Sequence, residues 1–146
     1  MFPSAPVSHG DYVAPIAAAP DGTFAVVFQA DSGQLWKCTP QTGGTPLGYA
    51  MAAGTGPSIT ALAHGGYEVA FQAGTGLLWE IGDYINFNTQ PGMRAGTSRS
   101  VTAVPGIILQ VAFQASSGIL WTQDLAPGGV SQGQGMALNS SPAIAT

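Results

Sequence analysis

The stretch GYEVAFQAGTGLLW, residues 66–79, decides the fold because close copies of it occur twice more in the chain. The copies are TFAVVFQADSGQLW at residues 23–36 and ILQVAFQASSGILW at residues 108–121. All three share Phe-Gln-Ala, a glycine and Leu-Trp, and steps of 43 and 42 residues separate their tryptophans. A fixed period of this length is the signature of a tandem-repeat protein.

The repeat predicts a single repeat domain over residues 1–146. Its units lie at approximately 14–56, 57–98 and 99–141, with a partial fourth unit at 142–146.

Each copy carries the pattern of a β-strand followed by a tight turn. Along Tyr67–Gln72 large apolar residues alternate with small or polar ones, and the segments 24–29 and 109–114 repeat this alternation. Period two predicts a strand with one bulky face and one small face, so that neighbouring sheets can interlock. The glycine before Leu-Trp suits a hairpin turn that needs a left-handed residue.

Four strands are expected in each unit. The first is short and falls at 16–19, 59–62 and 101–104, with a stub at 144–146. The second is the alternating segment, and the third carries Leu-Trp. The fourth is expected to centre on Met51, Met93 and Met136.

Four short antiparallel strands in such a unit are the size of a β-propeller blade, so we expect an all-β chain of three blades. Three blades do not close a ring, because propellers usually have about four to eight. The simplest closure is a homodimer with six blades. A chain cut from a longer propeller and a three-sheet β-prism are the alternatives.

The composition narrows the classes of ligand. The chain is 45% hydrophobic with 21 Gly and 11 Pro, which favours strands and turns over disorder. Its three basic residues, Lys37, Arg94 and Arg99, provide no electrostatic footprint for nucleic acid. No apolar stretch approaches the roughly 20 residues that a membrane span needs. Residues 1–20 show no signal-peptide pattern. A neutral ligand is expected.

The stretch from Gly56-Pro57-Ser58-Ile59 to Leu78-Trp79 resembles a tandem repeat common in secreted bacterial proteins. Its layout is similar to that of bacterial and fungal β-propeller lectins, including fucose-binding ones, and the resemblance covers residues 14–146. It implies a secreted or cell-surface protein that binds glycans, among them fucosylated glycans. The chain departs from the family where Asp31, Gly74 and Ser116 replace the usual Asn. Arg99 also stands where Pro57 and Pro142 stand in other units.

Nothing in the sequence predicts an enzyme, a metal site or a cofactor. No carboxylate recurs in all three units, and no pair is spaced as a glycosidase acid and nucleophile. His9 and His64 lack metal-ligand spacing. A hydrolase whose residues converge from several blades is left as a third reading.

The repeated aromatic and amide residues are the candidates for contact with a sugar. A tryptophan can stack on a sugar ring while an amide donates to and accepts from its hydroxyls. Equally, each Trp can serve blade packing and each Gln can bond to neighbouring backbone. The candidates are Trp36, Trp79, Trp121, Gln29, Gln72 and Gln114.

Repetition favours a binding module with shallow sites between blades, because repeated weak sites gain avidity on a multivalent surface. The sequence therefore predicts a lectin-like module, with a non-catalytic structural or protein-interaction scaffold as the alternative.

Overall fold

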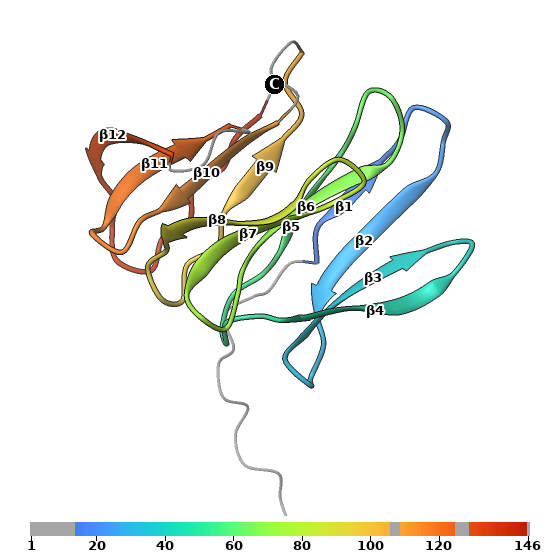
Figure 1. The fold of residues 1–146 in the computed structure, drawn as a ribbon, viewed down its shortest axis with the longest axis horizontal. Coiled ribbons are helices and arrows are strands. Elements are labelled where there is room, and N and C mark those ends of the chain that lie inside the picture. The colour runs from blue at the N-terminus through green and yellow to red at the C-terminus, as the bar shows by residue number, and fades with distance from the viewer. Residues whose placement is uncertain (1–13, 106–108, 125–128, 146) are drawn as a thin grey trace, which may run out of the picture.

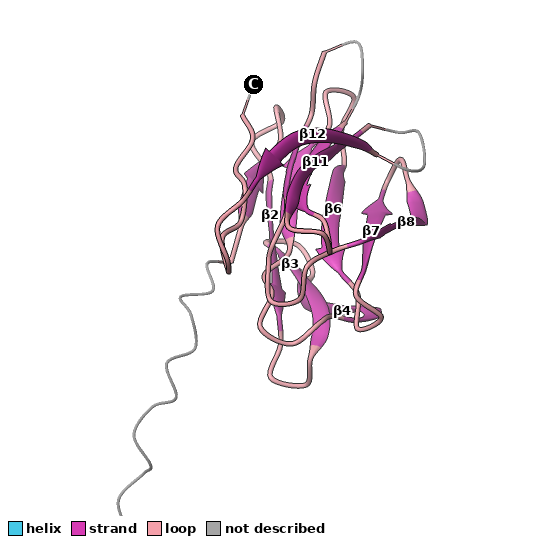
Figure 2. Ribbon diagram, turned by 90° about the vertical axis from the view of Figure 1, so that its left-hand side faces the viewer, coloured by secondary structure: helices cyan, strands magenta, loops and turns pink. Residues whose placement is uncertain are grey.

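The computed structural model describes residues 14–105, 109–124 and 129–145. These residues form twelve strands in three four-stranded antiparallel sheets, as predicted from the repeat. Figure 1 shows the sheets side by side, and Figure 2 shows only strands and loops in the described ranges. Within those ranges no helix has the length and hydrophobicity that a membrane crossing requires.

Each sheet is one blade, and its strands run in sequence order from the inner to the outer edge. Blade 1 contains β1 (Ile16–Ala18), β2 (Phe24–Gln29), β3 (Gln34–Thr39) and β4 (Gly43–Ala50). Blade 2 contains β5 (Ser58–Ala61), β6 (Tyr67–Gln72), β7 (Leu77–Gly82) and β8 (Asn86–Gly92). Blade 3 contains β9 (Ser100–Thr102), β10 (Gln110–Gln114), β11 (Ile119–Gln123) and β12 (Val130–Gly135).

The predicted hairpin between the second and third strands is confirmed in every blade. Phe28 pairs with Trp36, Phe71 with Trp79 and Phe113 with Trp121. The turn glycines have φ of +80° at Gly33 and +85° at Gly76 and Gly118, the left-handed region that favours glycine.

The expected position of the fourth strand was wrong. The outer strands end before the methionines, at Ala50, Gly92 and Gly135. Met51 instead forms an isolated bridge with Ala73 of the next blade, and Met93 does so with Ala115. The methionines therefore lie where the chain leaves one blade and joins the next.

Neighbouring blades interlock through unlike faces, as the alternation predicted. The large face of blade 2, which includes Val69, Phe71 and Ile81, packs on the small face of blade 1 around Ala25 and Val27. The large face of blade 3 packs in the same way on the small face of blade 2. We call the interface of blades 1 and 2 the first crevice and that of blades 2 and 3 the second crevice.

Side-chain hydroxyls join the inner strands of successive blades. Val101 N donates to Ser58 Oγ over 3.0 Å, and Ala103 N donates to Thr60 Oγ1 over 3.1 Å. Ile144 N donates to Ser100 Oγ over 3.2 Å. Ile144 thus bonds to blade 3 in the same way as Val101 of β9 bonds to β5 of blade 2. It lies where the inner strand of a fourth blade would lie.

The large face of blade 1 has no blade against it within the described residues. Ile16 is 63% exposed, whereas its equivalents Ile59 and Val101 are 7% and 6% exposed. Phe28 is likewise half-buried, while Phe71 and Phe113 are fully buried. This face is therefore an apolar surface, whereas the equivalent faces of blades 2 and 3 are buried against the preceding blade.

Candidate functional site

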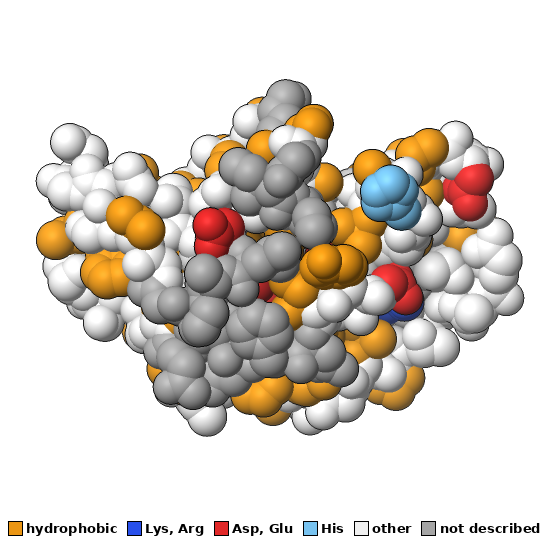
Figure 3. Space-filling model, turned by 45° about the horizontal axis from the view of Figure 1, so that its top comes forward, with side chains coloured by type: hydrophobic (Ala, Val, Ile, Leu, Met, Phe, Trp, Pro, Cys, Tyr) orange, Lys and Arg blue, Asp and Glu red, His pale blue; other side chains and the backbone are white. Residues whose placement is uncertain are grey.

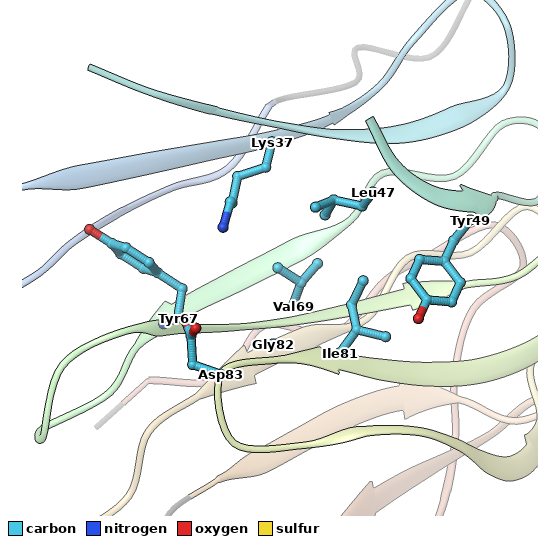
Figure 4. A pocket seen from close by; sticks show the side chains of 8 residues that line it. All are labelled: Lys37, Leu47, Tyr49, Tyr67, Val69, Ile81, Gly82 and Asp83. Atoms are coloured by element: carbon cyan, nitrogen blue, oxygen red, sulfur yellow. Dashed lines mark hydrogen bonds between the residues drawn. The ribbon is translucent and has the colours of Figure 1, made fainter. Parts of the chain in front are cut away.

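A cavity of about 260 Å³ opens in the first crevice. Blade 1 contributes β3 and β4 to its wall, and blade 2 contributes β6, the end of β7 and the residue after it. In Figure 4, Lys37 points from blade 1 toward blade 2, with Tyr67 and Asp83 at one end of the space and Tyr49 at the other. The lining residues are Lys37, Leu47, Tyr49, Tyr67, Val69, Ile81, Gly82 and Asp83.

Hydrogen bonds to the start of β6 hold Asp83 at the rim of this cavity. Asp83 Oδ2 accepts from Tyr67 N over 2.9 Å, and Asp83 N donates to Tyr67 O over 3.1 Å. A Cβ at Gly66 would lie 2.7 Å from Asp83 Oδ2, so only glycine leaves room for the carboxylate. The local backbone therefore fixes an exposed acceptor whose second oxygen can meet a ligand.

A hydroxyl bond across the crevice holds Tyr67. Thr23 Oγ1 donates to Asp21 Oδ1 over 2.7 Å, so its only proton is used. Tyr67 Oη, 3.1 Å from Thr23 Oγ1, is therefore the donor in the bond that links blade 2 to blade 1. The Tyr67 ring is thereby kept at the wall of the cavity.

Aromatic rings form the opposite end of the cavity. The Tyr49 ring lies 5.6 Å from Trp79 and 5.7 Å from Phe71, both at 54°. Tyr49 lines the cavity and Trp79 packs behind it. Such tilted contacts are favourable for aromatic pairs and hold Tyr49 in place.

Lys37 supplies the positive charge of the site. Its side chain is half-buried, and no carboxylate of the described chain pairs with its ammonium group. An ammonium group has only donors, so Lys37 Nζ can donate to acceptors of a bound molecule. The cavity thus presents a donor and a fixed acceptor between two tyrosine rings.

The second crevice is chemically different at the equivalent positions. Glu80 takes the place of Lys37, and Gln123 takes the place of Ile81. Glu80 and Gln123 are each 1% exposed, and neither side chain has a hydrogen-bond partner among the residues that the structure describes. Burial, together with the charges of Glu68 and Asp124, raises the pKa of Glu80 to about 8. The Glu80 carboxyl is therefore mostly protonated at neutral pH.

Glu68 lies beside Glu80 and has a structural partner. Its Oε1 accepts from Ile85 N over 2.8 Å and from Tyr84 N. Burial raises the pKa of Glu68, while these two backbone donors oppose the rise and the charge of Asp83 adds to it. Glu68 thus anchors the segment that follows β7.

The structure places the three predicted tryptophans in three different settings. Trp79 lies behind the first cavity, Trp121 packs in the second crevice, and Trp36 lies on the open face of blade 1. Each Nε1 is buried, and no described residue forms a hydrogen bond with it. Direct contact of these indoles with a sugar stays a prediction.

The three predicted glutamines bond to backbone, which was the structural reading of their repetition. Gln72 Nε2 lies 3.3 Å from Gly76 O, 3.3 Å from Met93 O and 3.4 Å from Arg94 O. Gln29 and Gln114 bond in the same way within their own blades. Each amide therefore ties the hairpin turn to the connection that follows the outer strand, and its contact with a ligand stays a prediction.

Arg99, next to the inner strand β9, forms hydrogen bonds across the interface between blades 2 and 3. Its Nε donates to Ala70 O over 2.9 Å, and its Nη2 donates to Gly56 O. Burial lowers the pKa of Arg99 to about 9. The residue that departs from the proline of the other units thus joins blade 3 to blade 2.

Four residues of this candidate site were not predicted from the sequence: Lys37, Tyr49, Tyr67 and Asp83. None of them recurs in all three units, whereas the predicted site residues are those that do recur. One signal in the sequence could have indicated this site. Lys37 is a charged residue at a position where the other units carry Glu80 and Thr122. In the described ranges, no group of three His, Cys, Asp or Glu residues is placed to hold a metal ion.

The chain is similar to two solved lectin structures, whereas no protein-family model and no curated protein sequence matches it. One is a fucose lectin from Kordia zhangzhouensis in complex with methyl-fucoside, with 11% identity and a TM-score of 0.59. That match covers 85% of this chain and 100% of the Kordia chain. The other is a mutant of the Aleuria aurantia lectin in complex with Fucalpha1-6GlcNAc, with 13% identity and a TM-score of 0.65. It covers 89% of this chain and 50% of the Aleuria chain. The three sheets thus share the fold of these lectins and are arranged as propeller blades.

Proposed function

We propose that this protein is a carbohydrate-binding module and that the cavity of the first crevice is a sugar site. The observation that carries the proposal is that one cavity holds both the Lys37 ammonium group, which no carboxylate of the described residues pairs with, and the fixed Asp83 carboxylate. The volume of the cavity, about 260 Å³, is slightly below the roughly 300 Å³ of the smallest usual small-molecule pockets. A single sugar ring is suited to this space.

The chemistry of the cavity matches a hydroxyl-rich, uncharged ligand. Sugar hydroxyls can donate to Asp83 and accept from Lys37, while the apolar face of the ring lies against Tyr49 or Tyr67. Hydrogen bonds to charged groups contribute about 1.5–3 kcal/mol each. Two such bonds suffice for a weak site that gains strength through multivalency.

Fucosylated glycans are the proposed ligands. The similar Kordia and Aleuria structures hold methyl-fucoside and Fucalpha1-6GlcNAc, which supports this class at the level of fold analogy. Sites between other blades would differ in preference, because Lys37 is replaced by Glu80 in blade 2 and by Thr122 in blade 3.

A glycan array followed by calorimetric titration tests the proposal. We expect the array to show binding to a related set of fucosylated glycans. Lys37→Met and Asp83→Asn should each weaken binding by about tenfold or more, since each removes a charged hydrogen bond. Asn keeps an acceptor for Tyr67 N, so Asp83→Asn should fold normally.

Asp31→Asn is the matched control, because Asp31 is an exposed carboxylate in the β2–β3 turn outside the cavity. It should leave sugar affinity unchanged. Binding that survives both Lys37→Met and Asp83→Asn in folded protein would reject this cavity as the site.

A non-catalytic scaffold is the second candidate. The observation in its favour is that the repeated glutamines bond to backbone and the tryptophan Nε1 atoms are buried. A blank array with correctly folded protein would favour the scaffold over the lectin.

We also propose that a second copy of the chain covers the open face of blade 1, giving a homodimer of six blades. The face carries Ile16 and Phe28, whose equivalents are buried in the other blades. A secreted or cell-surface location is part of the same proposal, because glycans are displayed there. Cell fractionation with an antibody to the protein would test the location.

A further inference from the structure

A second cavity, of about 490 Å³, lies at the end of the blades where the inner strands turn outward. All three blades contribute to its wall, and most of the wall is alanine, proline, leucine or valine. Figure 3, which brings this end forward, shows hydrophobic side chains in several places among the residues drawn in colour. We call this second cavity the axial cavity. Its described lining residues are Ala18, Pro20, Ala61, Leu62, Ala63, His64, Gly65, Asp83, Tyr84, Ala103, Val104 and Pro105.

Asp83 lines both the axial cavity and the cavity of the proposed sugar site, so the two cavities are neighbours at this residue. The segment between the two cavities is well fixed. Tyr67 N holds the Asp83 carboxylate, and Glu68 Oε1 accepts from the backbone of Tyr84 and Ile85. A ligand that reaches Asp83 from the first crevice therefore meets a preformed apolar space on the other side.

The lining indicates the kind of group that would enter. Tyr84 is 58% exposed, a large ring surface left without cover in the described chain. No lysine or arginine is among the described lining residues, and the Asp83 carboxylate would repel an anion. Burial of apolar area on such a wall is favourable by about 25 cal/mol per Å². An uncharged apolar group fits best.

We propose that the axial cavity binds an uncharged aryl or alkyl group attached to the sugar held in the first crevice. The inference rests on the proposed function and names its ligand more closely, as a glycoside or glycan with an apolar substituent. The sugar hydroxyls would face Lys37 and Asp83, and the substituent would pass Asp83 to lie against Ala61 and Tyr84.

The test compares methyl α-fucoside with 4-nitrophenyl α-fucoside by calorimetry. We expect the aryl glycoside to bind about tenfold more tightly, since burying roughly 60 Å² of apolar surface accounts for that ratio. Ala61→Gln should remove the advantage and leave the affinity for the methyl glycoside unchanged, because Ala61 lines only the axial cavity. The matched control is Ala53→Gln, at an exposed alanine outside both cavities.

Equal binding of the two glycosides would overturn the axial proposal and leave the sugar site standing. If neither glycoside binds, the sugar site fails, and the neutral fluorescent probe N-phenyl-1-naphthylamine then decides on the axial cavity. Probe binding to the wild type and to Ala53→Gln, but not to Ala61→Gln, would support an apolar site. No probe binding to the wild type would overturn it.

Discussion

Glu80 is the residue at which the second crevice departs most from the first. Its carboxyl is buried and has no hydrogen-bond partner in the described part of the chain, and its pKa of about 8 lies above the ordinary value of 4.5. The unfolded chain releases this proton near pH 4.5, while the folded chain keeps it until about pH 8. The contribution to stability is therefore largest below pH 4.5 and is lost as the pH rises to about 8.

We predict that Glu80→Gln flattens the pH dependence of the free energy of unfolding between pH 5 and pH 8.5. The upper limit of the effect is roughly 5 kcal/mol, because each pKa unit corresponds to about 1.4 kcal/mol. Urea unfolding at the two pH values measures it. Glu68, whose pKa is also raised, supplies a residual slope of the same sign. Asp31→Asn controls for loss of a surface charge, and an unchanged slope in Glu80→Gln would contradict the burial argument.

At the scale of elements, the hairpin between the second and third strands of a blade forms hydrogen bonds with the chain that links this blade to its neighbour. The Gln72 amide joins the turn to the connection after the outer strand, and the backbone oxygen of Gln72 accepts from Ala52 N, after blade 1, over 2.9 Å. We predict that Gln72→Met lowers the free energy of unfolding by about 1–3 kcal/mol, because Met93 O loses a buried donor. Gly76 O and Arg94 O keep donors from Met93 N and from Thr97.

Gln29→Met is the matched comparison, because Gln29 makes equivalent bonds but is only half-buried. Water can replace its amide there, so a loss of less than about 1 kcal/mol is expected. Urea denaturation of both variants measures the difference. Equal losses would show that burial does not set the value of these bonds.

Elements with a repeated pattern could be predicted from the sequence, and elements without one could not. Tyr67–Gln72 and its two relatives alternate clearly, and Gly76 marks the turn, so the second and third strands were correctly predicted. The outer strands Gly43–Ala50 and Val130–Gly135 share no such alternation and carry exposed or half-buried residues along their length. The fourth strand was predicted at the methionines because they recur in each unit, but they lie in the connections that follow the outer strands.

At the scale of the whole molecule, the number of blades and their order could be predicted, but the candidate site could not. A site between blades combines one position from each of two units, and the chemistry lies where the units differ. Lys37 and Asp83 come from different blades, and neither recurs. Periodicity finds the residues that build every blade, such as Gln72, and passes over those that distinguish one crevice from another.

Closure of the ring is the prediction that concerns the whole molecule. The open large face of blade 1 matches the faces that blades 2 and 3 bury, so a second copy should place its blade 3 against it. We expect a native mass of twice 14.7 kDa by light scattering. Val26→Asp should give monomers, because it puts a charge in the centre of that face. Ala53→Asp, at an exposed turn residue outside the strands of blades 1 and 3, should stay dimeric. A monomeric wild-type protein, or a dimer that survives Val26→Asp, would contradict closure through this face.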